Sequence, residues 1–137
     1  MDPSTRRERW EGMTHPPPSP LILVTGATGY IGGRLVPRLL AAGYRVRCMV
    51  RDPSRLDGRR WRHEVDVVAG DVLHPESLPT ALAGVDTAFY LVHSMAGGHA
   101  FHENDLQGAR NFSRALRDAG GTRIIYLGGL GDPAADL

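Results

Sequence analysis

Three glycines at a regular spacing, directly after a short apolar run, constrain this chain more than any other feature. Residues 21–25 read Leu-Ile-Leu-Val-Thr, and Gly26, Gly29 and Gly32 follow. A continuously apolar run is typical of a parallel strand that is buried on both faces. Glycines after such a strand permit a tight turn into a helix and a close approach of the backbone to a pyrophosphate. The free amides of that helix donate hydrogen bonds to phosphate oxygens, so the placement favours a nucleotide site over a glycine-rich turn without a ligand.

The rest of the chain alternates between strand-like and helix-like segments. Strands are predicted at residues 21–25, 44–50, 65–69, 87–92 and 123–127. Helices are predicted after the glycines, around residues 78–82, and before Gly120 and Gly121. The inward positions are Leu35, Leu39 and Leu40 in the first helix, and Leu106, Ala109, Phe112, Leu116 and Ala119 in the last. This alternation predicts an α/β fold with a doubly wound parallel sheet of five strands in the order 3-2-1-4-5.

One residue inside the first predicted helix disfavours a regular helix. The ring of Pro37 crowds the carbonyl group of Gly33, four residues earlier. We therefore expect Pro37 to kink or shorten this helix.

Composition places the chain among ordinary globular domains. Its 137 residues are 42% hydrophobic and 23% charged, which is enough for one core. The single cysteine, Cys48, excludes a disulfide scaffold and is interpreted as a buried, inert side chain. No apolar run is long enough to cross a membrane, and the formal net charge of +1 gives no general attraction to nucleic acid.

Residues 1–20 are predicted to be a disordered, proline- and arginine-rich leader, with the folded domain at residues 21–137. Prolines 16, 17, 18 and 20 resist helix, and the segment shows no apolar periodicity. The pair Arg6-Arg7 is not followed by the apolar stretch that an export signal needs, so we expect a cytoplasmic protein. Met13 is an alternative start that would remove most of this leader.

Four segments together resemble a known family. They are residues 25–32 (Thr-Gly-Ala-Thr-Gly-Tyr-Ile-Gly), 70–72 (Gly-Asp-Val), 91–94 (Leu-Val-His-Ser) and 105–112 (Asp-Leu-Gln-Gly-Ala-Arg-Asn-Phe). As a set they resemble the extended and atypical short-chain dehydrogenases/reductases, and the similarity runs from residue 21 to about residue 131. The resemblance implies the amino-terminal part of a Rossmann domain, with a dinucleotide across the carboxyl ends of the strands.

The resemblance also implies roles for individual residues. Asp71 would bond the adenine, and the segment from Leu91 to residue 94 would line the nicotinamide-ribose side. Two structural alternatives stay open: Asp71 caps the next helix, and Asn111 only packs or bonds a loop. The predicted cofactor-binding residues are Gly26, Thr28, Gly29, Tyr30, Ile31, Gly32, Arg51, Asp71, Val72, Leu91, Val92 and His93.

The end of the second strand favours NADP over NAD. An NAD site places an acid there, about 20 residues after the glycines, to bind the ribose 2′-hydroxyl. Here Val50 occupies that position, and Arg51 and Arg55 follow. A guanidinium offers planar, charge-assisted donors to a 2′-phosphate. The argument for NAD is Asp52, which a small loop shift would bring to the ribose.

Two further clusters have simpler interpretations than ligand binding. Seven arginines lie between residues 45 and 62, but only Trp61 is interleaved with them, so we favour a solvated surface beside the cofactor phosphate and predict no nucleic-acid binding. His99, His102 and Glu103 have a spacing that permits metal binding on one helical turn. We predict no metal site, because two histidines and an acid in a glycine-flanked loop occur more often without a metal than as metal ligands.

The catalytic residues that the resemblance implies are missing from this sequence. Catalytic members of the family use a Tyr-x-x-x-Lys pair beyond the fifth strand, in which lysine lowers the pKa of tyrosine. All 16 basic residues of this chain are arginine, and residues 126–137 contain no serine or threonine. A full dinucleotide domain also has a sixth strand, so we expect a carboxyl-terminally incomplete domain whose fifth strand is an exposed edge.

Three functional hypotheses follow. The first is the cofactor-binding portion of a longer oxidoreductase or epimerase-like protein, without its catalytic and substrate-binding part. The second is a non-catalytic NADP sensor, and the third is a fragment without activity. The substrate and the oligomeric state are not predictable from these residues.

Overall fold

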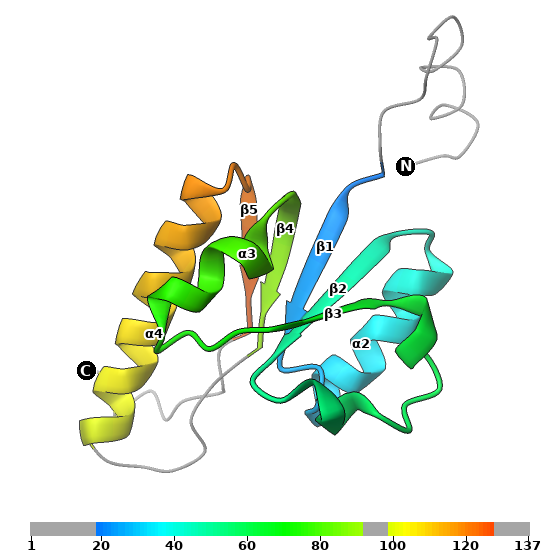
Figure 1. The fold of residues 1–137 in the computed structure, drawn as a ribbon, viewed down its shortest axis with the longest axis horizontal. Coiled ribbons are helices and arrows are strands. Elements are labelled where there is room, and N and C mark those ends of the chain that lie inside the picture. The colour runs from blue at the N-terminus through cyan, green and yellow to red at the C-terminus, as the bar shows by residue number, and fades with distance from the viewer. Residues whose placement is uncertain (1–18, 92–98, 128–137) are drawn as a thin grey trace, which may run out of the picture.

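Five parallel strands form one sheet in the order β3-β2-β1-β4-β5 (Figure 1). The computed structural model describes residues 19–91 and 99–127, and the side chains of residues 99–102 lie outside this set. The strands are β1 (Leu21–Thr25), β2 (Arg45–Val50), β3 (Asp66–Ala69), β4 (Val85–Tyr90) and β5 (Arg123–Tyr126). The predicted fold class and strand order are confirmed. The predicted leader falls on residues 1–18, outside the described residues, except for its last two positions.

Helices cover both faces of the sheet. They are α2 (Tyr30–Ala41), α3 (Leu78–Leu82) and α4 (His99–Asp118), with short 3-10 turns η1 (Pro53–Leu56), η2 (Arg62–Glu64) and η3 (Pro75–Ser77). In Figure 1, α2 lies beside β1 and β2, whereas α3 and α4 lie near β4 and β5. The helix α2 extends for 12 residues with Pro37 inside it. The helix therefore does not end at Pro37, where the exposed proline costs one hydrogen bond, and the expected kink stays a prediction.

Alternate residues of β1 supply two separate cores. Leu21 and Leu23 pack into the cluster under α3 and α4, while Ile22 and Val24 pack into the cluster under α2. Every residue of β1 is buried. This is the burial expected of a central parallel strand with helices on both sides, which explains its continuous apolar sequence.

The inward faces of two helices differ in detail from the prediction. In α2 the buried residues are Gly32, Val36 and Leu39, and Leu35 and Leu40 flank that face half-buried. In α4 Phe112 is fully buried, but Leu106 is 45% exposed. Six residues of helix turn through about 600°, so Leu106 lies about 120° away from Phe112 around the helix axis. The prediction that Leu106 points inward is wrong for this reason.

The arginine at the middle of β2 ties three elements together. The Nε of Arg47 lies 2.8 Å from the Oδ2 of Asp66 on β3. Its Nη1 donates to the carbonyl oxygens of Ala81 and Ala83, at 2.8 Å each. These carbonyls lie at the carboxyl end of α3, where cations are favourable.

The strand β5 is the last strand of the described sheet. All four residues of β5 are exposed, and Tyr126 is 60% exposed. In the described part of the chain, the prediction of an exposed fifth-strand edge is confirmed. No helix among the described residues is long and apolar enough to cross a membrane.

Candidate dinucleotide site

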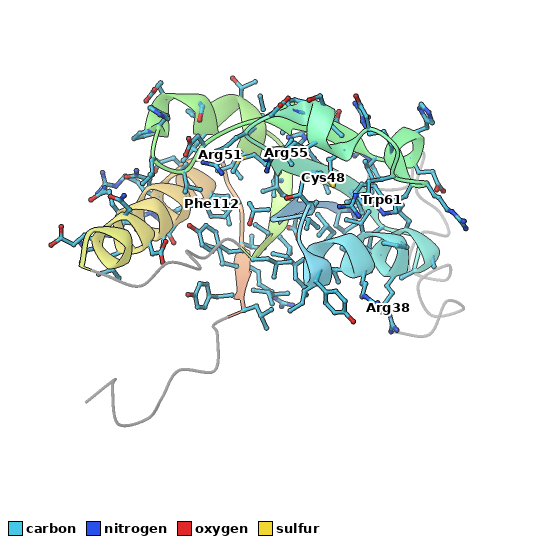
Figure 2. The ribbon with its side chains drawn as sticks, turned by 90° about the horizontal axis from the view of Figure 1, so that it is seen from below. Arg38, Cys48, Arg51, Arg55, Trp61 and Phe112 are labelled. Atoms are coloured by element: carbon cyan, nitrogen blue, oxygen red, sulfur yellow. The ribbon has the colours of Figure 1, made fainter. Side chains whose placement is uncertain are left out.

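The carboxyl ends of the strands gather the predicted site residues that the structure describes. Residues 26–32 connect β1 to α2, Arg51 follows β2, Asp71 follows β3 by two residues, and Leu91 follows β4. Because the strands are parallel, all four positions lie on one edge of the sheet, which faces the viewer in Figure 2. Val92 and His93 lie outside the described residues, so their predicted role stays a prediction.

A buried threonine holds β1 and β4 together at this edge. The hydroxyl of Thr25 donates to the carbonyl of Phe89 at 3.2 Å and accepts from the amide of Leu91 at 3.1 Å. The order of the strands reverses between β1 and β4, which is where ligands bind in open α/β sheets. Sequence reasoning missed this role of Thr25, although a single hydroxyl at the end of an apolar strand was visible.

Two of the three motif glycines, Gly26 and Gly32, occupy positions where a side chain does not fit. Gly26 has φ +76°, and a Cβ there would lie 3.1 Å from the Cβ of Leu91. The amide of Gly29 donates to the Gly26 carbonyl at 3.0 Å, which closes the turn. A Cβ on Gly32 would collide with the Gly26 carbonyl oxygen and lie 2.8 Å from the Cα of Ala27. These contacts match the roles in turn and close packing that the motif predicts.

The first turn of α2 is open to an anion. Its N-cap is Gly29, which offers no side-chain hydrogen bond, and the turn contains no acidic residue. The first amides of a helix need an external acceptor, and the helix dipole favours a negative one. Tyr30 and Ile31 are 73% and 50% exposed at this end, and the guanidinium of Arg34 lies 4.2 Å from the Tyr30 ring centroid.

The residues after β2 include both candidates for contact with the ribose, Arg51 and Asp52, and the structure distinguishes them. Arg51 and Arg55 are exposed (Figure 2). Asp52 is engaged locally: its Oδ1 accepts from the amide and the hydroxyl of Ser54, at 3.1 and 2.8 Å. These hydrogen bonds lower the pKa of Asp52 and hold its carboxylate at the start of η1.

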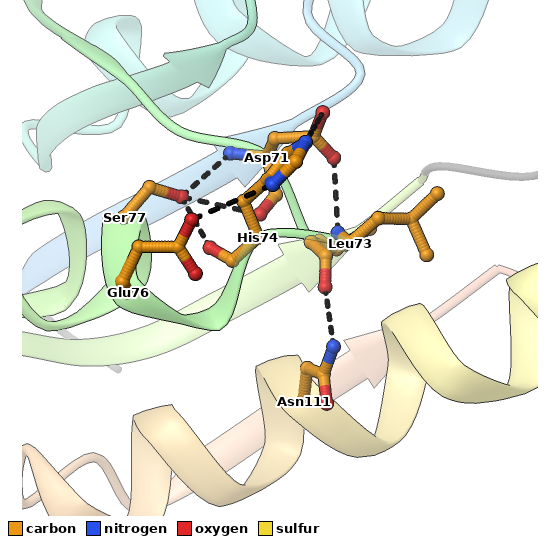
Figure 3. Close-up of polar contacts among 7 residues, drawn as sticks. Asp71, Leu73, His74, Glu76, Ser77 and Asn111 are labelled. Atoms are coloured by element: carbon orange, nitrogen blue, oxygen red, sulfur yellow. Dashed lines mark hydrogen bonds and ion pairs between the residues drawn. The ribbon is translucent and has the colours of Figure 1, made fainter.

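Asp71 closes a turn and leaves one carboxylate oxygen beside a histidine (Figure 3). Its Oδ1 accepts from the amide of Leu73 at 2.9 Å, and its Oδ2 lies 3.9 Å from the Nε2 of His74. The hydroxyl of Ser77 accepts from the Asp71 amide at 3.0 Å. The N-cap of η3 is His74 and the N-cap of α3 is Ser77, so the alternative that Asp71 caps the next helix is wrong.

The loop after β3 is held by α4. The Nδ2 of Asn111 donates to the carbonyl of Val72 at 2.8 Å, while the Oδ1 of Asn111 accepts from Gln107 at 2.8 Å. A Cβ on Gly108 would lie 2.7 Å from the Cγ2 of Val72, so a larger residue there would force the Val72 side chain to shift. Asn111 therefore does bond a loop, and the alternative that this is its only role stays a prediction.

The alternative of a metal site involves His99 and His102, whose side chains lie outside the described residues, so the absence of a metal site stays a prediction. Among the described residues, no group of three or more His, Cys, Asp or Glu side chains is placed to hold a metal ion.

Comparison with known proteins identifies the family. Residues 26–135 match the family described as NAD(P)H-binding, which is most of the chain. The chain belongs to this family. It is an NAD(P)-binding Rossmann domain of the extended short-chain dehydrogenase/reductase group, as the motifs predicted.

Known relatives show how much of such a protein this chain spans. It is 33% identical over 115 residues to a 3-beta-hydroxysteroid dehydrogenase of Mycolicibacterium neoaurum, covering 77% of this chain and 31% of the relative. The Citrobacter sp. triphenylmethane reductase complexed with NADP(H) is 33% identical with a TM-score of 0.63, over 77% of this chain and 36% of that one. A short-chain dehydrogenase/reductase superfamily protein from Agrobacterium tumefaciens with bound NAD is 27% identical with a TM-score of 0.64, over 77% and 31%. The chain thus spans about a third of the length of these proteins.

Proposed function

We propose that this chain binds NADP(H) in preference to NAD(H), as the cofactor-binding part of an oxidoreductase. The preference rests on the different states of Arg51 and Asp52, the two residues that follow β2. Arg51 is exposed and available to a 2′-phosphate, whereas the carboxylate of Asp52 is held by Ser54. A ribose 2′-hydroxyl would have to compete with both of those hydrogen bonds. The triphenylmethane reductase complexed with NADP(H) supports the same assignment, and the relative with bound NAD makes the test necessary.

Within this proposal, each part of the cofactor has its own residues. Gly26, Gly29 and the open first turn of α2 would hold the pyrophosphate, with Thr28, Tyr30, Ile31 and Gly32 around it. Asp71 and Val72 would contact the adenine, and Leu91 would line the nicotinamide side. The bound cofactor supplies hydride chemistry, and the residues described here bind and orient it.

The test is a titration of the purified chain with NADPH and NADH. We expect tighter binding of NADPH, and we expect Arg51→Ala to weaken NADPH by about 1–3 kcal/mol, or roughly 5- to 150-fold, through loss of charge-assisted hydrogen bonds. NADH binding should hardly change. The control is Arg38→Ala, which removes the same charge from the last turn of α2, away from the glycine-rich turn (Figure 2). Equal or tighter binding of NADH by the unmodified chain would refute the preference.

The same titration separates the alternatives. We do not expect turnover by this chain alone, because its sequence has no lysine for a Tyr-x-x-x-Lys pair. Binding of NADPH without turnover supports a cofactor-binding portion or a non-catalytic sensor. Absence of binding to a folded chain would support the third hypothesis, a fragment without activity.

A further inference from the structure

The turn between η1 and η2 is anchored on both sides. Leu56 is fully buried and Trp61 is 7% exposed, and both pack in the cluster under α2. Between them, the amide of Arg59 donates to the carbonyl of Leu56 at 3.1 Å, and the carbonyl of Arg59 accepts from the amide of Arg62 at 3.0 Å. The backbone of Arg59 is therefore held in place, although its side chain is exposed.

The side chain of Arg59 reaches the glycine-rich turn. Its Nη2 donates to the carbonyl oxygen of Thr28 at 3.2 Å, across 31 residues of sequence. Its Nη1 lies 3.6 Å from the position that a Cβ on Gly33 would occupy. One guanidinium thus contacts the turn itself and lies beside the first turn of α2.

No carboxylate of the described residues compensates the positive charge of Arg59. Among the described residues, Arg59 forms no ion pair with a carboxylate. A cation beside the first turn of a helix is unfavourable, because the helix dipole is positive there. A bound anion at this helix end would reverse that sign, and the pyrophosphate of the proposed cofactor is such an anion.

We infer that Arg59 is a positioning residue for the cofactor's pyrophosphate: it holds the Thr28 carbonyl and so fixes the glycine-rich turn in its binding conformation. The inference rests on the proposed function. NADPH and NADH share the pyrophosphate, so loss of Arg59 weakens both by the same factor. In this respect Arg59 differs from Arg51, whose loss affects NADPH selectively.

The test compares Arg59→Ala, Arg59→Lys and the control Arg60→Ala in the full chain. Arg60 is the exposed neighbour and forms no ion pair in the described structure. For Arg59→Ala we expect the Kd values of NADPH and NADH to rise by one common factor, about 5- to 20-fold, which overlaps the lower end of what a charge-assisted hydrogen bond contributes, because Arg59 is exposed and acts through the turn. Arg59→Lys should fall between Arg59→Ala and the unmodified chain, because lysine keeps the charge but not the planar fork. Arg60→Ala should leave both Kd values unchanged.

A second measurement does not need the cofactor. Hydrogen exchange of the amides at residues 26–33 should be faster in Arg59→Ala than in Arg60→Ala, because the turn has lost its tie. A selective loss of NADPH in Arg59→Ala would overturn the inference and make Arg59 a reader of the 2′-phosphate. Unchanged Kd values and unchanged exchange would also overturn it. If the unmodified chain binds neither cofactor, the proposed function fails, while exchange still decides whether Arg59 holds the turn.

Discussion

Gly32 and Gly33 are adjacent glycines in the first turns of α2, and the structure predicts opposite effects of alanine at the two positions. A Cβ on Gly32 would collide with the Gly26 carbonyl and lie 2.8 Å from the Cα of Ala27, where ordinary contacts begin at 3.4 Å. Both neighbours are backbone, so the helix and the glycine-rich turn must separate by at least about 0.6 Å. A Cβ on Gly33 meets nothing closer than the Ala27 carbonyl oxygen at 3.5 Å.

The expected magnitudes follow from these contacts. Overpacking of this kind costs about 1–3 kcal/mol, whereas alanine in place of glycine inside a helix stabilises by about 0.5–1 kcal/mol. Gly32→Ala should therefore destabilise the fold by about 1–2 kcal/mol, and Gly33→Ala should stabilise it by up to about 1 kcal/mol. For a domain of this size, 1 kcal/mol corresponds to roughly 4 °C in Tm, so the two variants should differ by about 4–12 °C.

Thermal unfolding followed by circular dichroism measures this difference, and an NADPH titration of the same samples tests the site. Gly32→Ala should also weaken NADPH at least about tenfold, because the displaced amides no longer converge on the pyrophosphate. Gly33→Ala should bind as the unmodified chain does. Equal Tm values for the two variants would show that the turn relaxes around a Cβ, and the close-packing argument for Gly32 would be wrong.

Two predictions concern groups away from the glycine-rich turn. Arg47→Met should lower the free energy of unfolding in urea by about 1–3 kcal/mol, since it leaves the part-buried carbonyl of Ala81 without its donor, whereas Arg45→Met, at the exposed start of β2, should change it little. Burial, with smaller contributions from Asp105 and Tyr126, raises the pKa of Tyr90 from 10.0 to about 12. The unfolded chain releases this proton first, so Tyr90 contributes stability below pH 10 that is lost between pH 10 and pH 12. Urea midpoints at pH 9, 10 and 11 should fall less steeply for Tyr90→Phe than for the unmodified chain, and parallel slopes would contradict this assignment.

The fold could be predicted from the sequence because its signals are local. The apolar run of β1, the glycine spacing and the alternation of segments each depend on neighbouring residues. The start of β4 shows where local reasoning fails. Val85 pairs with Leu21 and Thr87 pairs with Ile22, so the register shifts at Asp86, which has no partner on β1. Asp86 is also a charged residue inside the strand, and it interrupts the apolar pattern from which the strand was predicted. The predicted strand consequently began two residues late.

The candidate site could be predicted only in its local half. The glycine motif and Arg51 directly follow strands and Asp71 lies two residues after one, and parallel topology brings such positions to one edge. The hydroxyl of Thr25 bonds groups more than 60 residues away, and Arg59 bonds a carbonyl 31 residues away. No periodicity or spacing reports a contact of that kind. Arg59 was visible only as one of seven clustered arginines.

Because the sequence contains no lysine, each of its 16 Lys/Arg side chains is a guanidinium. A guanidinium presents several donors in a plane, whereas an ammonium is a compact charge. Arg47 uses this geometry to reach a carboxylate and two carbonyls at once, and Arg34 lies over the ring of Tyr30. Arg59 reaches the glycine-rich turn in the same way. Guanidinium groups thus build the fold and border the proposed phosphate site, and proton transfer of the Tyr-x-x-x-Lys kind needs a residue type that this sequence does not contain.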